Sequence, residues 1–451
     1  MILNYEQFIK TIPNKKTFVL FGNKLTHSIS SNIHSKIFKE YDLDAEYFHV
    51  ELKKEQLCDA INHLKKHYCG ANVTIPYKTD VMEFLDECDE VSSRLNSVNT
   101  ILVKDGKTFG YNTDIIGIYE SLAKDGISLK NKKVALLGYG GTANVVADIL
   151  AKNGADTVIF GRDLQKASKL QKYVLNNFPD AIIKIEKFEN FSNDYELIFN
   201  TTPFGMNELE GQSPIDDFSS AEYVFDCVYN PQITKIIDIA RNYGIKSRSG
   251  LNMLYTQALF AQHIWFDFDV TRPNDIYDEL SSELFIKRLK DRNIVLFGFM
   301  GCGKTTVSNL LASETGLNLV DTDTFIEKME GEKVSEIFAT KGEPHFRVCE
   351  TKCAEILAKQ QNNIISTGGG FVIDEKNVEI LAENSVFVFI DTTFEEIFSR
   401  VSNDPTRPLS KADTLKELFD KRYPIYSSIN ALTVSGAMSP EQIVDEIIGK
   451  V

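Results

Sequence analysis

The stretch from residue 298 to residue 305 has the residue types and spacing that bind a phosphate chain. It reads Gly-Phe-Met-Gly-Cys-Gly-Lys-Thr, which fits the pattern G-x-x-x-x-G-K-T. In such a loop the backbone N–H groups surround the phosphates, and here Lys304 would reach the terminal phosphates while Thr305 would bind Mg²⁺. A glycine turn beside a surface lysine is the alternative. An apolar run at 293–297 and a helix-like run at 306–314 favour the nucleotide site.

Polar residues also stand where other strands are expected to end. Lys78 lies just past a strand that ends at a proline, and open α/β sheets bind ligands at the carboxyl ends of their strands. A single lysine is, however, more often solvated surface. Asp114 or its neighbour Thr113 could do no more than cap the helix that follows. Ser28 and Ser30, at a turn before a helix, leave the same two interpretations open.

A glycine turn between a strand at 133–137 and a helix at 142–152 resembles a dinucleotide-binding fingerprint. The turn reads Gly138-Tyr139-Gly140-Gly141, with its third glycine shifted from the usual position. The next strand ends in Arg162-Asp163. An arginine there favours the 2′-phosphate of NADP and an acid favours the 2′-hydroxyl of NAD, so the residues alone leave both cofactors open.

The composition predicts a globular protein with several cores. A chain of 451 residues is too long for one core, and 43% hydrophobic content is ordinary. The net charge of −15 argues against a nucleic-acid partner, so an anion site must be built locally from Arg or Lys. We expect no signal peptide and no membrane span, because the sequence shows neither pattern. Seven cysteines without C-x-x-C spacing favour a reducing cytoplasm, and Cys349 and Cys353 are interpreted as packing residues rather than ligands.

Strands that alternate with helices predict an α/β fold with parallel sheets. A hairpin is expected to turn at Asp105-Gly106, which is typical of type I′ turns. The helix expected at 274–287 ends in a charged run that we interpret as a stiff, helical linker. Residues 400–411 are polar and broken by prolines, as in a mobile lid. Further strands are expected at 17–22, 45–50, 157–160, 318–320, 363–367 and 386–390.

The order of motifs in the first about 285 residues resembles shikimate dehydrogenase. The resemblance implies a substrate domain of residues 1–112, completed by 248–287, and a Rossmann NADP-binding domain of residues 113–247. The active site would lie in the cleft between these two domains. The matching motifs are the 28–30 serine loop, 72–78, Asn99, 112–114, the 138–141 turn, 200–202, Gly205-Met206 and Gly250 through Gln257.

The resemblance also assigns roles in this first half. Lys78 and Asp114 would be the catalytic pair, since a lysine ammonium can stabilise the charge that hydride transfer leaves on a ketone oxygen. Arg162 favours NADPH, with NADH as the alternative because Asp163 stands where a small hydroxyl residue is usual. The residues implied to bind substrate are Ser28 and Ser30 at the carboxylate, Thr74, Asn99 and Gln257 at the ring hydroxyls, and Tyr229. Those implied to bind the cofactor are Gly138, Gly140, Gly141, Thr142, Arg162, Thr201, Gly250 and Met253.

After a linker at 288–292, residues 293–451 resemble shikimate kinase, a small P-loop kinase with helices on both faces of a parallel sheet. Asp323 would hold and deprotonate the substrate hydroxyl, and Lys304 and the lid residue Arg407 would be further catalytic groups. The residues implied to bind substrate are Asp323, Arg347 and Arg422 as a carboxylate clamp, Gly369 and Gly370. Those implied to bind ATP are Gly298, Gly301, Cys302, Gly303, Lys304, Thr305, Thr306, Arg400 and Arg407, with Mg²⁺ on Thr305 and Asp321.

Together the two resemblances imply a bifunctional shikimate-pathway enzyme. The first half would reduce 3-dehydroshikimate to shikimate with NADPH, and the second would phosphorylate the 3-hydroxyl from Mg·ATP. One alternative is a quinate/shikimate dehydrogenase of broader specificity fused to the kinase. Another is a non-catalytic metabolite-sensing regulator, which the retained Lys78, Asp114, Lys304, Asp323 and Arg407 disfavour. The expected partners are small molecules, with neither nucleic acid nor membrane, and the sequence predicts no oligomeric state.

Overall fold

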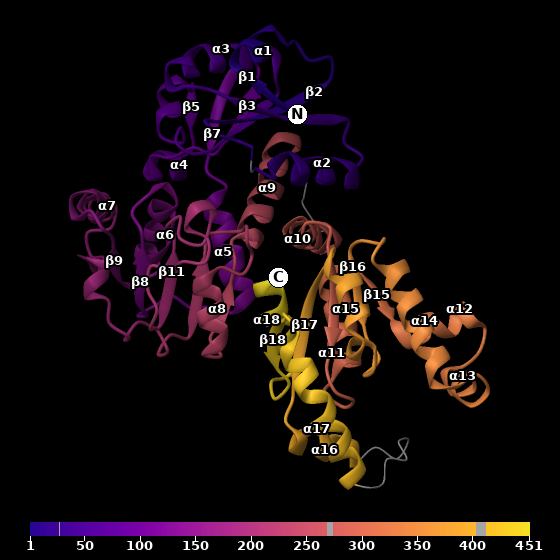
Figure 1. The fold of residues 1–451 in the computed structure, drawn as a ribbon. Coiled ribbons are helices and arrows are strands. Elements are labelled where there is room, and N and C mark those ends of the chain that lie inside the picture. Colours follow the sequence, from indigo (N-terminus) through magenta and orange to yellow (C-terminus); the bar gives the residue numbers. More distant parts are fainter. Residues whose placement is uncertain (27, 268–273, 403–411) are drawn as a thin grey trace. The chain divides into compact units, whose positions relative to one another are not determined.

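A computed structural model describes residues 1–26, 28–267, 274–402 and 412–451 (Figure 1). The chain divides into two compact units, Met1–Asp278 and Glu279–Val451. Both units alternate strands with helices, which confirms the predicted α/β class. Among the helices that the structure describes, none is both long and apolar enough to cross a membrane. The finer division into a substrate domain, a Rossmann domain and a linker stays a prediction.

The first part of unit 1 is a mixed sheet. Its elements are β1 (Ile2–Asn4), α1 (Tyr5–Lys10), β2 (Lys16–Gly22), α2 (Ser30–Glu40), β3 (Ala45–Glu51), α3 (Leu57–His67), β4 (Gly70–Val73), β5 (Glu87–Cys88), α4 (Glu90–Leu95), β6 (Thr100–Lys104) and β7 (Lys107–Tyr111). In the described residues these strands are ordered β1-β3-β2-β4-β6-β7-β5. The neighbours from β1 to β4 are parallel, whereas β6 runs antiparallel to both β4 and β7.

The hairpin between β6 and β7 confirms a turn predicted from two residues. Lys104 pairs with Lys107, so Asp105 and Gly106 form a two-residue connection. Their φ angles are +52° and +71°, as both central positions of a type I′ turn require. The hairpin returns the chain along β7 to Tyr111, and this fixes where Asp114 can lie.

The second part of unit 1 is a parallel sheet. Its elements are α5 (Asp114–Asp125), β8 (Lys133–Leu137), α6 (Gly141–Lys152), β9 (Asp156–Phe160), α7 (Leu164–Asn177), β10 (Ile183–Glu186), β11 (Leu197–Asn200), β12 (Tyr223–Asp226), α8 (Lys235–Asn242), β13 (Lys246–Arg248) and α9 (Leu251–Phe266). The described strands follow the order β10-β9-β8-β11-β12-β13, which is the 3-2-1-4-5-6 order of doubly wound dinucleotide-binding sheets. The order reverses between β8 and β11. Ligands of such sheets bind there, beyond the carboxyl ends of the strands.

Two contacts hold the two parts of unit 1 together. The long helix α9 packs against α2 and β6 of the first part as well as against α5 of the second. In addition, Arg94 at the end of α4 makes a two-pronged ion pair with Asp148 of α6, with Nε to Oδ1 at 2.9 Å and Nη2 to Oδ2 at 3.0 Å. Asp148 is fully buried. Removal of either partner would leave a charge uncompensated, so the pair ties α4 firmly to the second sheet.

Unit 2 is built on one parallel sheet, and α10 (Asn274–Leu289) crosses the boundary between the units. Its elements are β14 (Asn293–Phe297), α11 (Lys304–Thr315), β15 (Asn318–Asp321), α12 (Thr322–Glu330), α13 (Val334–Thr340), α14 (Gly342–Leu357), β16 (Asn363–Ser366), α15 (Glu375–Ala382), β17 (Ser385–Asp391), α16 (Phe394–Ser402), α17 (Ala412–Ser428), β18 (Leu432–Ser435) and α18 (Pro440–Lys450). The described strands are ordered β15-β16-β14-β17-β18, with the strand before the phosphate loop in the centre. The helices α12, α13 and α14 pack together at one end of the unit (Figure 1).

The interpretation of the charged run before β14 as helical is wrong for its last residues. The helix α10 ends at Leu289, and Lys290 and Asp291 have φ angles of +55° and +58°. This left-handed conformation ends the helix, since the chain must reverse to enter β14 at Asn293. The N–H of Arg292 donates to the Leu289 carbonyl and closes the turn. The predicted lid falls largely on residues 403–411, which lie outside the described residues.

A buried carboxyl group lies at the end of β12. Asp226 Oδ1 accepts hydrogen bonds from Asn200 Nδ2 at 2.9 Å and from the N–H of Val228 at 3.0 Å. Its Oδ2 lies 2.5 Å from the Thr234 hydroxyl. Burial raises the pKa of Asp226 to about 7, against the lowering effect of these hydrogen bonds. The folded state therefore keeps this proton far more readily than the unfolded chain does.

Substitution Asp226→Asn should flatten part of the pH dependence of stability. A carboxyl group whose folded pKa is raised contributes stability that is complete below its unfolded pKa, near 3.8, and is lost as the pH rises through about 7. Asn keeps the shape and carries no titratable proton. From about pH 4 to about pH 8 we expect the wild type to lose stability relative to the variant, measured as the denaturant midpoint of unit 1. A constant difference between the two proteins over that range would contradict the raised pKa.

Candidate active sites

The first candidate site forms around a contact between an ammonium and a carboxylate. Lys78 follows β4 and Asp114 begins α5, and Lys78 Nζ lies 2.5 Å from Asp114 Oδ2. The two side chains are only 18% and 8% exposed. Lys78 is thus not a solvated surface lysine. Thr113 occupies the N-cap position of α5 but makes no side-chain cap, so capping does not explain this pair of residues.

Amide and hydroxyl side chains converge on the same carboxylate. Asn99 Nδ2 donates to Asp114 Oδ1 at 2.8 Å, and Asn99 Oδ1 accepts from the N–H of Thr113 at 2.8 Å. The Thr113 hydroxyl donates to Gln257 Oε1 at 3.3 Å. Gln257 comes from α9, far along the chain. The structure therefore brings together four residues that the sequence predicts for this site: Lys78, Asn99, Asp114 and Gln257.

Asn112 is part of this arrangement, although the sequence prediction gave it no role at the site. Its Oδ1 accepts from the N–H of Asp114 at 3.1 Å, and its Nδ2 donates to the carbonyl of Ser97 at 2.9 Å. Asn112 is buried and holds the first turn of α5 in place. The signal was its spacing, because an Asn often accepts a bond from the N–H two residues later.

The two serines predicted to bind a carboxylate form a local pair at the start of α2. Ser28 Oγ donates to Ser30 Oγ at 3.2 Å and accepts from the N–H of Ser30 at 3.3 Å. Within the described residues, no hydrogen bond links either serine to Lys78 or Asp114. Thr74 directly follows β4, and its N–H donates to the carbonyl of Phe21. Tyr229 follows β12 and has its pKa raised by burial. Their roles as ligands stay predictions.

The glycine turn after β8 has room for an anion. Gly138 has a φ of +107°, and a Cβ there would lie 2.6 Å from the Thr201 hydroxyl, so only glycine fits. At Gly140 and Gly141 a Cβ would meet nothing within 4 Å. This open turn lies at the N-terminus of α6, where free N–H groups and the helix dipole attract phosphates.

The structure shows the role of Asp163, the acid beside Arg162 after β9. Asp163 Oδ1 accepts from the N–H groups of Gln165 at 3.0 Å and Lys166 at 3.2 Å, so Asp163 caps α7. Arg162 is exposed. The acid thus has a structural role of its own, and its presence does not argue for a ribose 2′-hydroxyl.

The start of α9 packs tightly against the strand beside it. The N–H of Gly250 donates to the Val228 carbonyl at 2.9 Å, and a Cβ at Gly250 would lie 2.2 Å from the carbonyl oxygen of Cys227. Burial raises the pKa of the Cys227 thiol, and Asp114 and Lys78 are among the charges that act on it. Met253 is buried one turn further along α9. These contacts bring the predicted cofactor residues of α9 next to the first site.

The second candidate site begins at the phosphate loop of unit 2. Gly298, Gly301 and Gly303 have φ angles of +153°, +82° and +100°, which L side chains rarely adopt. Lys304 Nζ donates to the Gly298 carbonyl at 2.8 Å and lies 3.7 Å from the sulfur of Cys302. Cys302 is buried, so its side chain packs beneath the loop, and any contact with ATP would come from its backbone. Thr305 and Thr306 are exposed at the start of α11.

Two carboxylates stand where β15 runs into α12. Asp321 caps the N-terminus of α12, and Asp323 lies in its first turn. Burial raises the pKa of Asp323, the nearby Asp321 raises it further, and Lys304 and Arg347 oppose the rise. A Cβ at Gly368 would lie 2.5 Å from Asp323 Oδ1. The loop after β16 therefore passes directly over this carboxylate.

The same loop also meets two guanidinium groups. A Cβ at Gly370 would lie 2.3 Å from Arg347 Nη1, and one at Gly369 would lie 3.2 Å from Arg422 Nη1. Bare backbone thus lets both arginines approach the loop that passes over Asp323. Two guanidinium groups at a loop that also meets a carboxylate base can hold an anionic substrate that carries a hydroxyl group.

Three supporting residues of this second site were not predicted. Arg347 Nη1 donates to Glu350 Oε2 at 2.7 Å and Nη2 donates to Glu343 Oε1 at 2.7 Å. Glu350 is 1% exposed, and burial raises its pKa more than Arg347 lowers it. The Tyr426 hydroxyl donates to the Gly369 carbonyl at 2.5 Å. Glu343 and Glu350 lie four and three residues from Arg347 on one helix, a spacing that sequence alone could have flagged.

The structure describes only one of the two arginines predicted to lie on the nucleotide side. Arg400 Nη2 donates to the Gly436 carbonyl at 2.8 Å, which places it at the end of β18. Arg407 lies outside the described residues, so its predicted role in the lid stays a prediction.

Substitution Glu350→Gln tests whether the buried acid positions Arg347. Loss of a buried charge partner should weaken binding of an anionic acceptor and raise its KM about tenfold, with a smaller effect on kcat and none on the KM for ATP. Glu343→Gln is the matched control, because Glu343 contacts the same guanidinium from a solvent-exposed position. Steady-state kinetics with each substrate varied in turn would check this. Equal effects of the two substitutions would contradict the positioning role.

Three family profiles match the chain in succession. Residues 20–101 match the shikimate dehydrogenase substrate binding domain, and residues 121–213 match shikimate / quinate 5-dehydrogenase. Residues 300–451 match shikimate kinase.

Individual relatives match the N-terminal part of the chain. A shikimate dehydrogenase (NADP(+)) of Caldicellulosiruptor bescii is 38% identical over 277 residues, which cover 59% of this chain and 94% of that protein. A chorismate mutase/shikimate 5-dehydrogenase fusion protein from Clostridium acetobutylicum matches with a TM-score of 0.56 and 33% identity, over 60% of this chain and 99% of the other. Shikimate 5-dehydrogenase from Thermus thermophilus, solved with NADP(H) and shikimate, matches with a TM-score of 0.54 and 26% identity. This match covers 60% of this chain and 99% of the other.

Proposed function

Since the chain belongs to the shikimate dehydrogenase family and continues into a shikimate kinase domain, we propose that it catalyses two consecutive steps on one ring. Unit 1 reduces 3-dehydroshikimate to shikimate, and unit 2 phosphorylates the new hydroxyl to give shikimate 3-phosphate. The observation that carries the first step is the shielded contact of 2.5 Å between Lys78 and Asp114. The second step is supported by the partly buried Asp323 beneath a glycine loop that Arg347 and Arg422 also approach.

In the first step, side chains of the protein stabilise and protonate the oxygen of the ketone. NADPH supplies the hydride, and the open turn at Gly140 and Gly141 fits its pyrophosphate. As charge develops on the substrate oxygen, the Lys78 ammonium stabilises it and donates the proton. Asp114 orients Lys78, and Asn99 orients Asp114 through the bond of 2.8 Å. Exclusion of water around the pair strengthens each of these interactions.

In the second step unit 2 must bind an anion and remove a proton from its hydroxyl. Arg347 and Arg422 hold the ring carboxylate, with Arg347 fixed by Glu350. Asp323 accepts the hydroxyl proton, and its raised pKa makes it a stronger base than an ordinary aspartate. Lys304 attracts the transferring phosphoryl group. Thr305 and Asp321 offer the oxygen ligands that Mg²⁺ prefers, and the ion would neutralise phosphate charge.

A broader first activity is the second candidate. Residues 121–213 match a family described as shikimate / quinate 5-dehydrogenase, so quinate is a reasonable further substrate. Turnover of quinate with NAD⁺ at a kcat/KM comparable to that for shikimate with NADP⁺ would favour this candidate. A regulator without turnover is disfavoured, because Lys78 contacts Asp114 and the glycine loop lies against Asp323, as catalysis would require.

We place the protein in a reducing compartment such as the cytoplasm. All seven of its cysteines lie in the described part of the chain, and each is a free thiol. Its expected partners are the small-molecule substrates and the two nucleotides.

Single substitutions should separate the two activities. Lys78→Ala removes the proton donor, so reduction of 3-dehydroshikimate should fall by at least about 10²-fold while phosphorylation of added shikimate stays near normal. Asp323→Ala should have the opposite effect. NADPH consumption and ADP release, each followed alone, would measure this. Loss of both activities in a variant that stays folded would contradict two independent sites.

Substitution Arg162→Ala should change the choice of cofactor. An arginine that bonds the 2′-phosphate contributes roughly 1.5 to 3 kcal/mol, so kcat/KM with NADPH should fall about 10- to 100-fold. The value with NADH should change little. Asp163→Asn is the control, because Asn can keep the cap of α7 and should leave the ratio of the cofactors intact. A wild-type preference for NADH would contradict the role of Arg162.

A further inference from the structure

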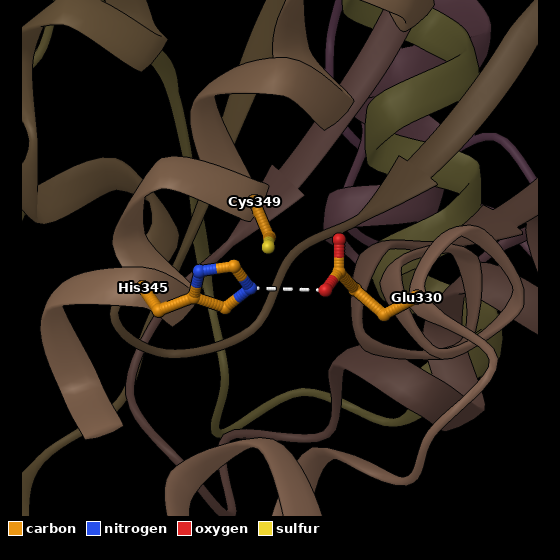
Figure 2. Close-up of side chains that lie close together, drawn as sticks. All are labelled: Glu330, His345 and Cys349. Carbon is orange, nitrogen blue, oxygen red and sulfur yellow. Dashed lines mark hydrogen bonds and ion pairs between the residues drawn. The ribbon is translucent and has the colours of Figure 1, made fainter. Parts of the chain in front are cut away.

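Three potential metal ligands meet in unit 2 at a place that neither proposed reaction uses. Glu330 is the last residue of α12, and His345 and Cys349 lie one turn apart on α14. Their ligand atoms all lie within 4.8 Å of one another. Figure 2 shows the imidazole, the thiol and the carboxylate pointing toward one another. His345 Nε2 lies 2.9 Å from Glu330 Oε2.

Helix stability does not account for this arrangement. Glu330 places a negative charge at the negative end of α12, and His345 lies in the first turns of α14, where a positive charge is unfavourable. Glu330 Oε2 accepts hydrogen bonds from His345 Nε2 at 2.9 Å and from Lys341 Nζ at 3.0 Å, so the carboxylate is held beside the buried Cys349.

We propose that Glu330, His345 and Cys349 bind one divalent transition-metal ion of the zinc class. A thiolate, an imidazole and a carboxylate form the mixed donor set that Zn²⁺ accepts, with three protein ligands and a fourth place for water. Ligand atoms in such a site lie about 3 to 4 Å apart, so small side-chain rotations close the cluster. Glu330 and His345 are 17% and 36% exposed, which gives the ion a route from solvent.

The binding step is balanced by the release of a proton. The Cys349 S–H bond breaks, its proton leaves to the buffer and a sulfur–metal bond forms. The Nε2–H that bonds Glu330 is lost to solvent and Nδ1 carries the proton of the neutral imidazole, so Nε2 presents a lone pair to the metal. One carboxylate oxygen of Glu330 completes the protein ligands. No group is oxidised or reduced.

The lysine that now bonds Glu330 has another acceptor. Lys341 Nζ lies 3.0 Å from Glu330 Oε2 and 3.3 Å from Glu332 Oε1. The other oxygen of Glu332, Oε2, is buried and has no hydrogen-bond partner among the described residues. When Glu330 binds a metal ion, Lys341 can pair with Glu332 alone. The charges of Lys341 and Glu332 then both remain paired.

The metal would connect the two helices that carry residues of the second site. Asp323 begins α12 and Arg347 lies on α14 between His345 and Cys349. A bound ion would therefore limit the movement of α12 against α14. This consequence rests on the proposed function, whereas metal binding itself does not.

Titration of the full chain with Co²⁺ tests the site without reference to activity. We expect one ion to bind per chain with a thiolate-to-cobalt absorption band in the near ultraviolet, which Zn²⁺ abolishes and Mg²⁺ leaves unchanged. His345→Ala and Cys349→Ser should each remove the band. Lys341→Gln should tighten binding severalfold, because it removes a competing cation.

Cys353→Ser is the matched control, since Cys353 is as buried as Cys349 on the same helix and should leave the band intact. His345 is partly exposed, so His345→Ala decides the test if Cys349→Ser does not fold. Absence of the band in the wild type at Co²⁺ well above the protein concentration would overturn the proposal. Persistence of the band at unchanged affinity in folded His345→Ala would overturn it too, because the imidazole would then not be a ligand.

Discussion

The contact between Lys78 and Asp114 depends on where the chain passes from one sheet of unit 1 to the other. Lys78 lies in the loop after β4 of the first sheet, and Asp114 opens α5, the helix that leads into the second sheet and packs on α9. An ammonium and a carboxylate removed from water must stay paired, so any movement that separates these two elements exposes an uncompensated charge. The ion pair between Arg94 and Asp148 imposes the same condition at a second place. The geometry of unit 1 is thus constrained by two shielded ion pairs, because separating either pair would leave a charge unpaired away from water.

Unit 2 reaches a comparable result with different residues. Its carboxylate, Asp323, is shielded by a loop of bare glycine backbone rather than by amide side chains. Guanidinium groups approach where side chains on the loop would block them, and Glu350 holds one of them from a fully buried position. In the function that we propose, the two units offer one anionic ring two different environments, hydroxyls and amides in the first and arginines in the second. This difference fits two reactions of opposite demand, since one must deliver a proton and the other must remove it.

Much of this could be predicted because the signals were local. The turn at Asp105-Gly106, the glycines of both nucleotide turns and the strands around them each follow from a few adjacent residues. What could not be predicted depends on distant partners. Whether Asp114 capped a helix or faced Lys78 could not be decided from the residues alone until the resemblance was used.

Local reasoning failed at one informative place. The run before β14 was expected to continue its helix, but the need to reverse into the sheet put Lys290 and Asp291 in left-handed conformations. Cys349 was interpreted as a packing residue, and it is indeed buried in the core with Cys353. Only the fold of α12 against α14 brings Glu330 to it, and no motif in the sequence records that approach.

The central claim is that one carbon of one ring passes through both sites, and an isotope experiment tests it directly. The purified full chain would receive 3-dehydroshikimate, NADPH deuterated at the transferable hydride and Mg·ATP, and the product would be analysed by mass spectrometry and NMR. We expect shikimate 3-phosphate with deuterium at C3, the carbon whose oxygen carries the phosphate. Accumulation of deuterated shikimate without phosphorylation, or of unlabelled product, would contradict this account.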